Sequence, residues 1–132
     1  MSTSDLPAEG QPDESAEGAE APFDDVITLS TSTDEDGVVT VTVVGEVDTF
    51  TAPVLRSTLD SQLEQQPREL VIDLSGVQFL GSAGLAVLVE TQKSSRSREV
   101  GLRLIASTRA VTRPLEVTGL IDLFTIADST AR

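Results

Sequence analysis

The stretch LVIDLSGVQFLGSAGLAVLVE, residues 70–90, joins a short apolar run to an apolar helical pattern through a segment of small residues. Residues 70–74, LVIDL, form a continuous apolar run that is typical of a strand covered on both faces. The following SGVQF is expected to be a connection, and a helix is predicted from about Ser82 to Ser94. A buried strand that leads into such a helix indicates an α/β fold, in which helices pack against a sheet.

Upstream of this stretch the sequence predicts an antiparallel pair of strands. In VITLSTS, residues 26–32, apolar side chains alternate with polar ones, as they do in a half-buried strand. Residues 38–44, VVTVTVV, are rich in β-branched side chains, which favour strands. The Asp36-Gly37 pair between the two runs is a hairpin signal, so the two strands are expected to pair with each other.

A helix is predicted after this pair of strands. Thr51 is the candidate N-cap, and Pro53 lies in the first turn, where a helix tolerates proline. Leu55, Leu59 and Leu63 recur at every fourth position and therefore form one apolar stripe. This stripe is interpreted as a core-facing surface.

The C-terminal part of the chain is predicted to add two strands and a last helix. GLRLIA, residues 101–106, and LFTIA, residues 123–127, are interpreted as strands. The helix between them is expected to end near Gly119 and, because Pro114 removes a helical hydrogen bond, to begin late with Thr112 as its cap or to be kinked. The resulting order, β-β-α-β-α-β-α-β, predicts a mixed sheet of about five strands packed with about three to four helices.

The negative charge of the chain is concentrated at its N-terminal end. The formal net charge is −13, and residues 1–36 hold 11 acidic and no basic side chains, whereas residues 37–132 hold 11 acidic and 9 basic ones. Residues 1–24 are predicted to be a disordered acidic tail, followed by a folded domain at residues 25–132. The acidity of the tail disfavours nucleic acid and anionic membranes as partners.

The composition also disfavours several classes of chemistry. The chain has no cysteine and no histidine, so it lacks a thiolate, the usual general base and the commonest metal ligand. We therefore predict no catalytic residue, no metal site and no cofactor, and we expect a protein that is not an enzyme. Neither a signal peptide nor an apolar run long enough to cross a membrane is visible, so a cytoplasmic location is expected.

Ser82 lies between Gly81 and Ala83-Gly84, and three interpretations of it are open. As a helix N-cap it would stabilise the helix by about 1 kcal/mol relative to alanine. As a nucleophile it lacks a histidine to activate it, and Leu80 stands where a Gly-x-Ser-x-Gly motif requires glycine. As a phosphorylation site it would place a charge of about −1.5 to −2 at a helix N-terminus, which favours an anion, and would alter recognition without unfolding the domain.

The sequence resembles the STAS domains of the anti-sigma factor antagonist family. The likeness is carried by GEVDTFTAPVLR at residues 45–56, by LVIDLSGVQFLGSAGLAVLVE at residues 70–90 and by VTRPLEVTGLIDLFTIADS at residues 111–129. The middle segment is the most specific, because the strand, DLSGV and Ser-Ala-Gly-Leu occur in the order and spacing of the family. The resemblance implies a STAS-type mixed sheet packed with helices.

The resemblance also implies a function for Ser82. It implies phosphorylation of Ser82 by a cognate anti-sigma factor, a serine kinase of the GHKL ATPase type, and removal of the phosphate by a serine phosphatase. The unphosphorylated protein would bind the kinase and so release the sigma factor. Partner contacts are implied in a loop and at a helix start, at Asp48, Thr49, Phe50 and Thr51 and at Gly81, Ser82, Ala83 and Gly84.

Two alternatives stay open at this point. One is a STAS scaffold or interaction subunit of a lipid-transport or stress-sensing complex, in which Ser82 only caps its helix. The other is a small-ligand or nucleotide-binding domain, although no glycine-rich phosphate loop supports it. The chain also departs from the resembled pattern, since Gly81 stands where the family often has an acidic residue and Ala83 where it often has a second serine.

Overall fold

The strand-forming segments assemble into one five-stranded sheet, in the order β1-β2-β3-β4-β5, in the computed structural model, which describes residues 27–127. In chain order the elements are β1 (Ile27–Thr33), β2 (Val38–Val47), α1 (Ala52–Glu64), β3 (Glu69–Leu80), α2 (Ser82–Ser97), β4 (Gly101–Ile105), α3 (Arg109–Val117), the 3-10 helix η1 (Leu120–Leu123) and β5 (Thr125–Ala127). β1 pairs with β2 in antiparallel fashion, and the other neighbouring strands are parallel. The predicted element order and mixed sheet are confirmed.

The hairpin between β1 and β2 closes at the turn that the sequence signalled. One carboxylate oxygen of Asp34 accepts hydrogen bonds from the backbone N–H groups of Asp36 (2.8 Å) and Val38 (3.0 Å). Gly37 has a φ of 83°, in the left-handed region that favours glycine. The predicted Asp36-Gly37 turn is therefore confirmed.

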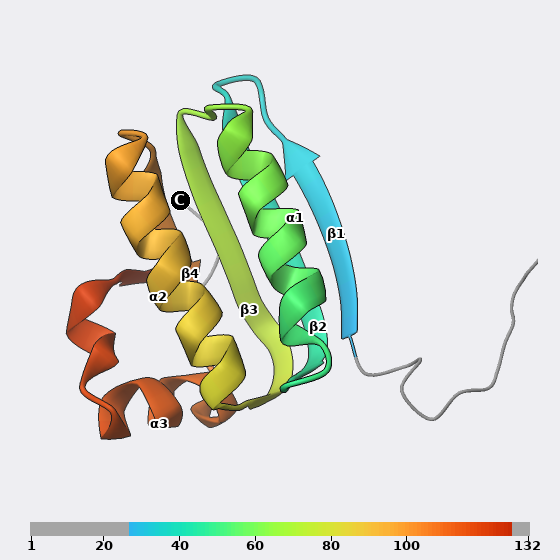
Figure 1. Cartoon of the computed structure of the whole chain (residues 1–132), viewed down its shortest axis with the longest axis vertical. Helices are drawn as coiled ribbons and strands as arrows, with labels where there is room; N and C mark the ends of the chain where they lie inside the picture. Colours follow the sequence, from blue (N-terminus) through green and yellow to red (C-terminus); the bar gives the residue numbers. More distant parts are fainter. Residues whose placement is uncertain (1–26, 128–132) are drawn as a thin grey trace, which may run out of the picture.

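Helices α1 and α2 lie side by side over one face of the sheet (Figure 1). The predicted stripe of α1 faces this sheet, because Leu55, Leu59 and Leu63 are all at most 1% exposed. Alternate strand residues complete the same core, among them Val39, Val41 and Val43 of β2 and Leu70, Ile72 and Leu74 of β3. Each buried side chain of this size stabilises the fold by about 1.5–3 kcal/mol, so the core determines where the two helices lie.

Strand β3 is longer than the sequence indicated, since it continues past Leu74 to Leu80. Its register with β2 shifts at two places, because β3 contains one extra residue at each. At the first shift the backbone N–H of Ser75 donates to the carboxylate of Asp73 (3.0 Å). The expectation that SGVQF is a connection is therefore wrong: such bulges interrupt the alternation of apolar and polar residues that would otherwise reveal the strand.

Helix α3 begins earlier than expected. It starts at Arg109 after Thr108 as the N-cap residue, so the late start with Thr112 as cap is wrong, and Pro114 lies inside the helix. The helix presents Val111 and Leu115, four residues apart and both 0% exposed, to the core. Burial of these two side chains offsets the hydrogen bond that the proline removes. The predicted end is confirmed, because Gly119 follows the helix with a φ of 77°.

The predicted acidic tail, residues 1–24, and the proposed start of the domain at residue 25 lie outside the described residues. Within residues 27–127, no helix is long and apolar enough to cross a membrane.

Candidate functional site

The candidate site lies where the parallel strands β2 and β3 end together. Val47, the last residue of β2, pairs with Leu80, the last residue of β3. The backbone N–H of Gly81 then donates to the carbonyl oxygen of Val47 (2.9 Å), which holds the two strand ends together. The loop before α1 and the first turn of α2 both start here, and Figure 1 shows the N-terminal ends of α1 and α2 at this end of the sheet.

The loop between β2 and α1 is held by its own side chains. One carboxylate oxygen of Asp48 accepts hydrogen bonds from the backbone N–H groups of Phe50 (2.9 Å) and Thr51 (3.0 Å). The hydroxyl of Thr51 donates to the carbonyl oxygen of Glu46 (2.9 Å) and accepts from the N–H of Asp48 (2.9 Å). Asp48 thus shapes the loop, and Phe50, at the tip of the loop, is 71% exposed.

Thr51 occupies the N-cap position of α1, as predicted, but its hydroxyl does not cap the helix. The hydroxyl is turned back into the preceding loop, and only the Thr51 carbonyl takes part in the helix, where it accepts from the N–H groups of Val54 and Leu55. The side chain is 4% exposed, so Thr51 is a buried support of the loop.

Ser82 is the first residue of α2, and Gly81 is the N-cap residue. The interpretation of Ser82 as an N-cap is therefore wrong: the backbone of Gly81 is extended, and its carbonyl oxygen accepts the first helical bond from the N–H of Leu85 (3.0 Å). Ser82 is exposed, and among the described residues its hydroxyl has no hydrogen-bond partner. An accessible hydroxyl therefore stands beside the backbone N–H groups of a helix N-terminus, which attract anions.

A hollow of about 210 Å³ opens around this hydroxyl and is lined by Asp48, Thr49, Phe79, Gly81, Ser82 and Ala83. The structure therefore brings together five of the eight predicted site residues from two separate segments. Phe50 lies in the same loop but does not line the hollow. Phe79 lines the hollow and was not predicted. The sequence offered one signal for Phe79: it is one of only four aromatic residues in the chain, and it lies three positions before Ser82.

Gly84, another predicted partner contact, faces the core. A Cβ atom at this position would lie 2.6 Å from Cγ1 of Val47 and 2.7 Å from Cδ1 of Leu80. Both neighbours are buried, so only glycine allows the first turn of α2 to approach the ends of β2 and β3 this closely. Gly84 positions the turn that carries Ser82.

A second, more apolar groove of about 430 Å³ starts at Ser82 and runs along α2 on the side bordered by η1. It is lined by Ser82, Leu85, Ala86, Val89, Glu90, Lys93 and, from η1, Leu120. The side-chain amide of Gln92 donates to the carbonyl oxygen of Leu123, which holds η1 against α2. Ser82 therefore lies between two concave surfaces.

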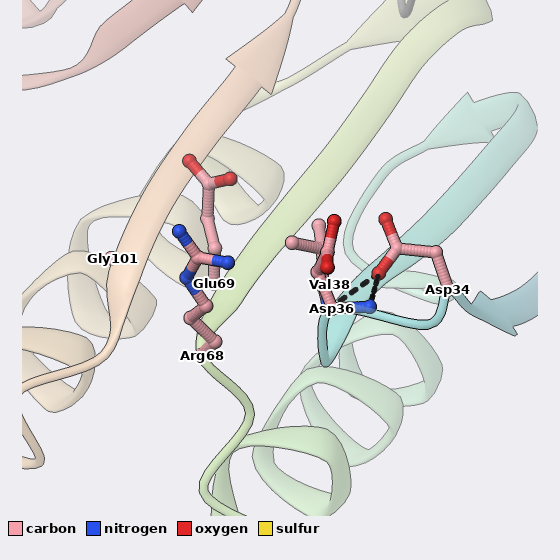
Figure 2. A pocket seen from close by; sticks show the side chains of 6 residues that line it. All are labelled: Asp34, Asp36, Val38, Arg68, Glu69 and Gly101. Atoms are coloured by element: carbon pink, nitrogen blue, oxygen red, sulfur yellow. Dashed lines mark hydrogen bonds between the residues drawn. The ribbon is translucent and has the colours of Figure 1, made fainter.

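A polar hollow of about 390 Å³ lies at the opposite end of the sheet (Figure 2) and is lined by Asp34, Asp36, Val38, Arg68, Glu69 and Gly101. It is remote from Ser82 because Val38, Glu69 and Gly101 are the first residues of their strands, whereas Ser82 follows a strand end. Within residues 27–127, no group of three or more acidic, histidine or cysteine side chains is placed to hold a metal ion. The predicted site residues and this hollow are separate.

Residues 31–132 match the STAS domain family. The chain is 37% identical over 101 residues to the anti-sigma-F factor antagonist RsfB of Mycobacterium tuberculosis, an alignment that covers 76% of this chain and 80% of that protein. It is also 37% identical over 84 residues to the anti-sigma-B factor antagonist of Listeria monocytogenes, covering 64% of this chain and 74% of that protein.

Solved structures share the same architecture. An anti-sigma factor antagonist from Mycobacterium paratuberculosis superposes with a TM-score of 0.74 and 39% sequence identity, over 85% of this chain and 92% of that chain. The anti-sigma factor antagonist SpoIIAA in its unphosphorylated form shares the fold, with a TM-score of 0.66 and 14% identity, over 77% of this chain and 90% of that chain.

Proposed function

Since the chain belongs to the STAS domain family, we propose that it is an anti-sigma factor antagonist that is switched off by phosphorylation of Ser82. In this proposal it binds an anti-sigma factor serine kinase of the GHKL ATPase type and thereby releases a sigma factor. The phosphorylated form dissociates, and a serine phosphatase restores the binding form. The protein performs no catalysis of its own and acts in the cytoplasm, where transcription takes place.

The antagonist role is supported by the relatives, which are themselves named anti-sigma factor antagonists and align over most of their own length. The partner surface that we propose consists of the hollow around Ser82 and the exposed Phe50 beside it. Thr51 and Gly84 lie beneath this surface, where they hold the loop and the helix start in position.

The single observation that carries the phosphorylation switch is the exposed Ser82 hydroxyl at the first position of α2. A kinase active site can reach this oxygen, and the oxygen caps no helix, so its modification removes no hydrogen bond between described residues. The phosphate adds about −1.5 to −2 charges, which the free N–H groups of the first turn and the helix dipole stabilise. We therefore expect phosphorylation to leave the fold unchanged.

Phosphorylation would instead act on the partner. A surface that covers the hollow in the unmodified complex would have to remove water from the phosphate, and burial of an unpaired charge is strongly unfavourable. The charged side chain that lines this hollow, Asp48, is acidic, so the hollow offers no positive charge to pair with the phosphate. The dianion is therefore expected to prevent binding rather than to reshape the antagonist.

The test compares baits in a pull-down from the native cell, followed by calorimetry with the purified anti-sigma factor ATPase that the wild-type bait recovers. Ser82→Ala is expected to bind like the wild type and to accept no phosphate, whereas Ser82→Glu is expected to bind about tenfold more weakly or worse. Ser97→Glu is the matched control, because it adds the same charge at an exposed serine at the other end of α2. Equal binding by Ser82→Glu and Ser97→Glu would contradict the switch.

The same reagents separate the switch from a scaffold role. Incubation of the unmodified protein with the recovered ATPase and ATP, followed by intact-mass measurement, is expected to add one phosphate to the wild type and none to Ser82→Ala. A scaffold subunit without a switch would bind its partner and gain no phosphate in either form.

A further inference from the structure

Phe79, the second-last residue of β3, has an exposed aromatic side chain, whereas the last residue of the strand is buried. It is 51% exposed, whereas Leu80 is 4% exposed, because the two residues point to opposite faces of the sheet. Of the three phenylalanines within residues 27–127, Phe50 and Phe79 are exposed; Phe79 lines the hollow around Ser82, and Phe50 follows Thr49, which also lines it. A large apolar side chain left in water at such a place is typical of a contact surface.

The ring of Phe79 lies against the backbone immediately before Ser82. A Cβ atom built on Gly81 would be 3.1 Å from Cε2 and 3.3 Å from Cζ of Phe79. The absence of a side chain at Gly81 thus lets the ring lie close to the backbone without a tight contact. The ring forms one wall of the 210 Å³ hollow, and the Ser82 hydroxyl lies in the same hollow.

This geometry determines what a partner meets on its way to Ser82. The hollow is small, and Asp48, Thr49 and Phe79 surround its serine. Asp48 is already engaged by the backbone of its own loop, so the ring is the large apolar surface still available for contact. A group that reaches the hydroxyl through this hollow therefore touches the ring of Phe79.

We propose that Phe79 is an affinity- and specificity-determining contact for the anti-sigma factor kinase, receiving an apolar side chain that the kinase places beside Ser82. This inference rests on the proposed function. A buried aromatic at the centre of an interface commonly dominates the binding energy, and half of this ring is still available for burial. The contact also couples to the switch, because a phosphate on Ser82 would have to lie within the dry interface that the ring forms with the kinase.

The test measures binding of the full-length protein to the purified anti-sigma factor ATPase by calorimetry, with thermal unfolding as a check on folding. Phe79→Ala is expected to weaken binding by about ten- to a hundredfold, and Phe79→Leu by less, because leucine keeps an apolar surface. Val117→Ala is the matched control, since Val117 is also exposed and lines none of the hollows described above. It is expected to bind like the wild type.

Two further readouts separate a contact role from a merely structural one. Phosphorylation of Phe79→Ala by the ATPase is expected to show a raised KM with a nearly unchanged kcat, which is the signature of lost binding rather than lost chemistry. In a double-mutant cycle, Phe79→Ala and Ser82→Glu are expected to be non-additive, because both act on one contact.

The outcomes distinguish this inference from the function on which it rests. If Phe79→Ala is folded and binds within twofold of the wild type while Ser82→Glu loses binding, the inference is overturned and the switch stands. If Phe79→Ala loses binding no more than Val117→Ala does, the inference is equally overturned. If the wild type itself binds no anti-sigma factor ATPase, the proposed function fails, and the inference fails with it.

Discussion

Replacing Gly84 by alanine is expected to destabilise the protein although alanine favours helices. The new Cβ atom would lie 2.6 Å from Cγ1 of Val47 and 2.7 Å from Cδ1 of Leu80. These separations are about 1 Å shorter than the roughly 3.5 Å at which two carbon atoms normally pack. Val47 is 0% and Leu80 4% exposed, so neither side chain can move into solvent, and the first turn of α2 must shift instead.

Two opposing effects determine the size of the change. Alanine gains at most about 1 kcal/mol of helix propensity over glycine, and less this close to a helix end. Overpacking of a well-filled core costs about 1–3 kcal/mol, and two simultaneous clashes with buried atoms place this site in the upper half of that range. We therefore expect a net destabilisation of about 1–2 kcal/mol, with about 4–8 °C of lowered melting temperature for each kcal/mol.

The assay is urea and thermal unfolding followed by circular dichroism, and the chain offers a matched control. The same substitution at Gly101 places a Cβ 3.5 Å from Cγ of Glu69, which is an ordinary contact, and the φ of Gly101 is not positive. Gly101→Ala is therefore expected to be neutral or slightly stabilising. The reasoning is refuted if Gly84→Ala is as stable as Gly101→Ala.

The remaining predictions concern the core and the loop. Leu59→Ala is expected to lower the free energy of unfolding by about 2–5 kcal/mol in a urea titration, because it leaves a cavity at a fully buried position. Val54→Ala, on the exposed side of α1, should change this free energy far less. Similar effects of the two substitutions would contradict the assigned faces of α1. Thr51→Val is expected to lower the free energy of unfolding by about 1–3 kcal/mol, because it leaves the N–H of Asp48 without its acceptor. Thr49→Val, at an exposed position of the same loop, should be nearly neutral. A neutral Thr51→Val would show that the hydrogen bonds of Thr51 do not hold the loop.

Hydrophobic periodicity was sufficient to predict most of the fold. The leucine stripe of α1 and the alternation in β1 each indicated a surface that faces the core, and the β-branched side chains of β2 indicated a strand, so these elements were predictable from local sequence. The second half of β3 could not be read in this way, because its two extra residues break the alternation. The early start of α3 was also hidden, since the local penalty of Pro114 is outweighed by burial of Val111 and Leu115, which depends on tertiary packing.

Five of the eight predicted site residues line the hollow around Ser82, but the sequence did not reveal their individual roles. The resemblance to a known family singled out the loop at Asp48 and, with the small residues around it, Ser82; the parallel pairing of β2 and β3 brings these two segments to one edge. Sequence spacing could not reveal that the hydroxyl of Thr51 turns away from its helix or that Gly81 rather than Ser82 is the N-cap residue. It also could not identify Phe79 as a wall of the hollow, because strand register decides which of two neighbouring residues is exposed.

The central claim is that a phosphate on Ser82 abolishes partner binding without altering the fold. The most direct measurement compares the unmodified protein with the protein phosphorylated at Ser82, using calorimetry against the anti-sigma factor ATPase and backbone amide chemical shifts in the free state. We expect the affinity to fall by about a hundredfold or more, with shift changes confined to the residues around the hollow. Unchanged affinity, or shift changes spread through the whole sheet, would contradict the account.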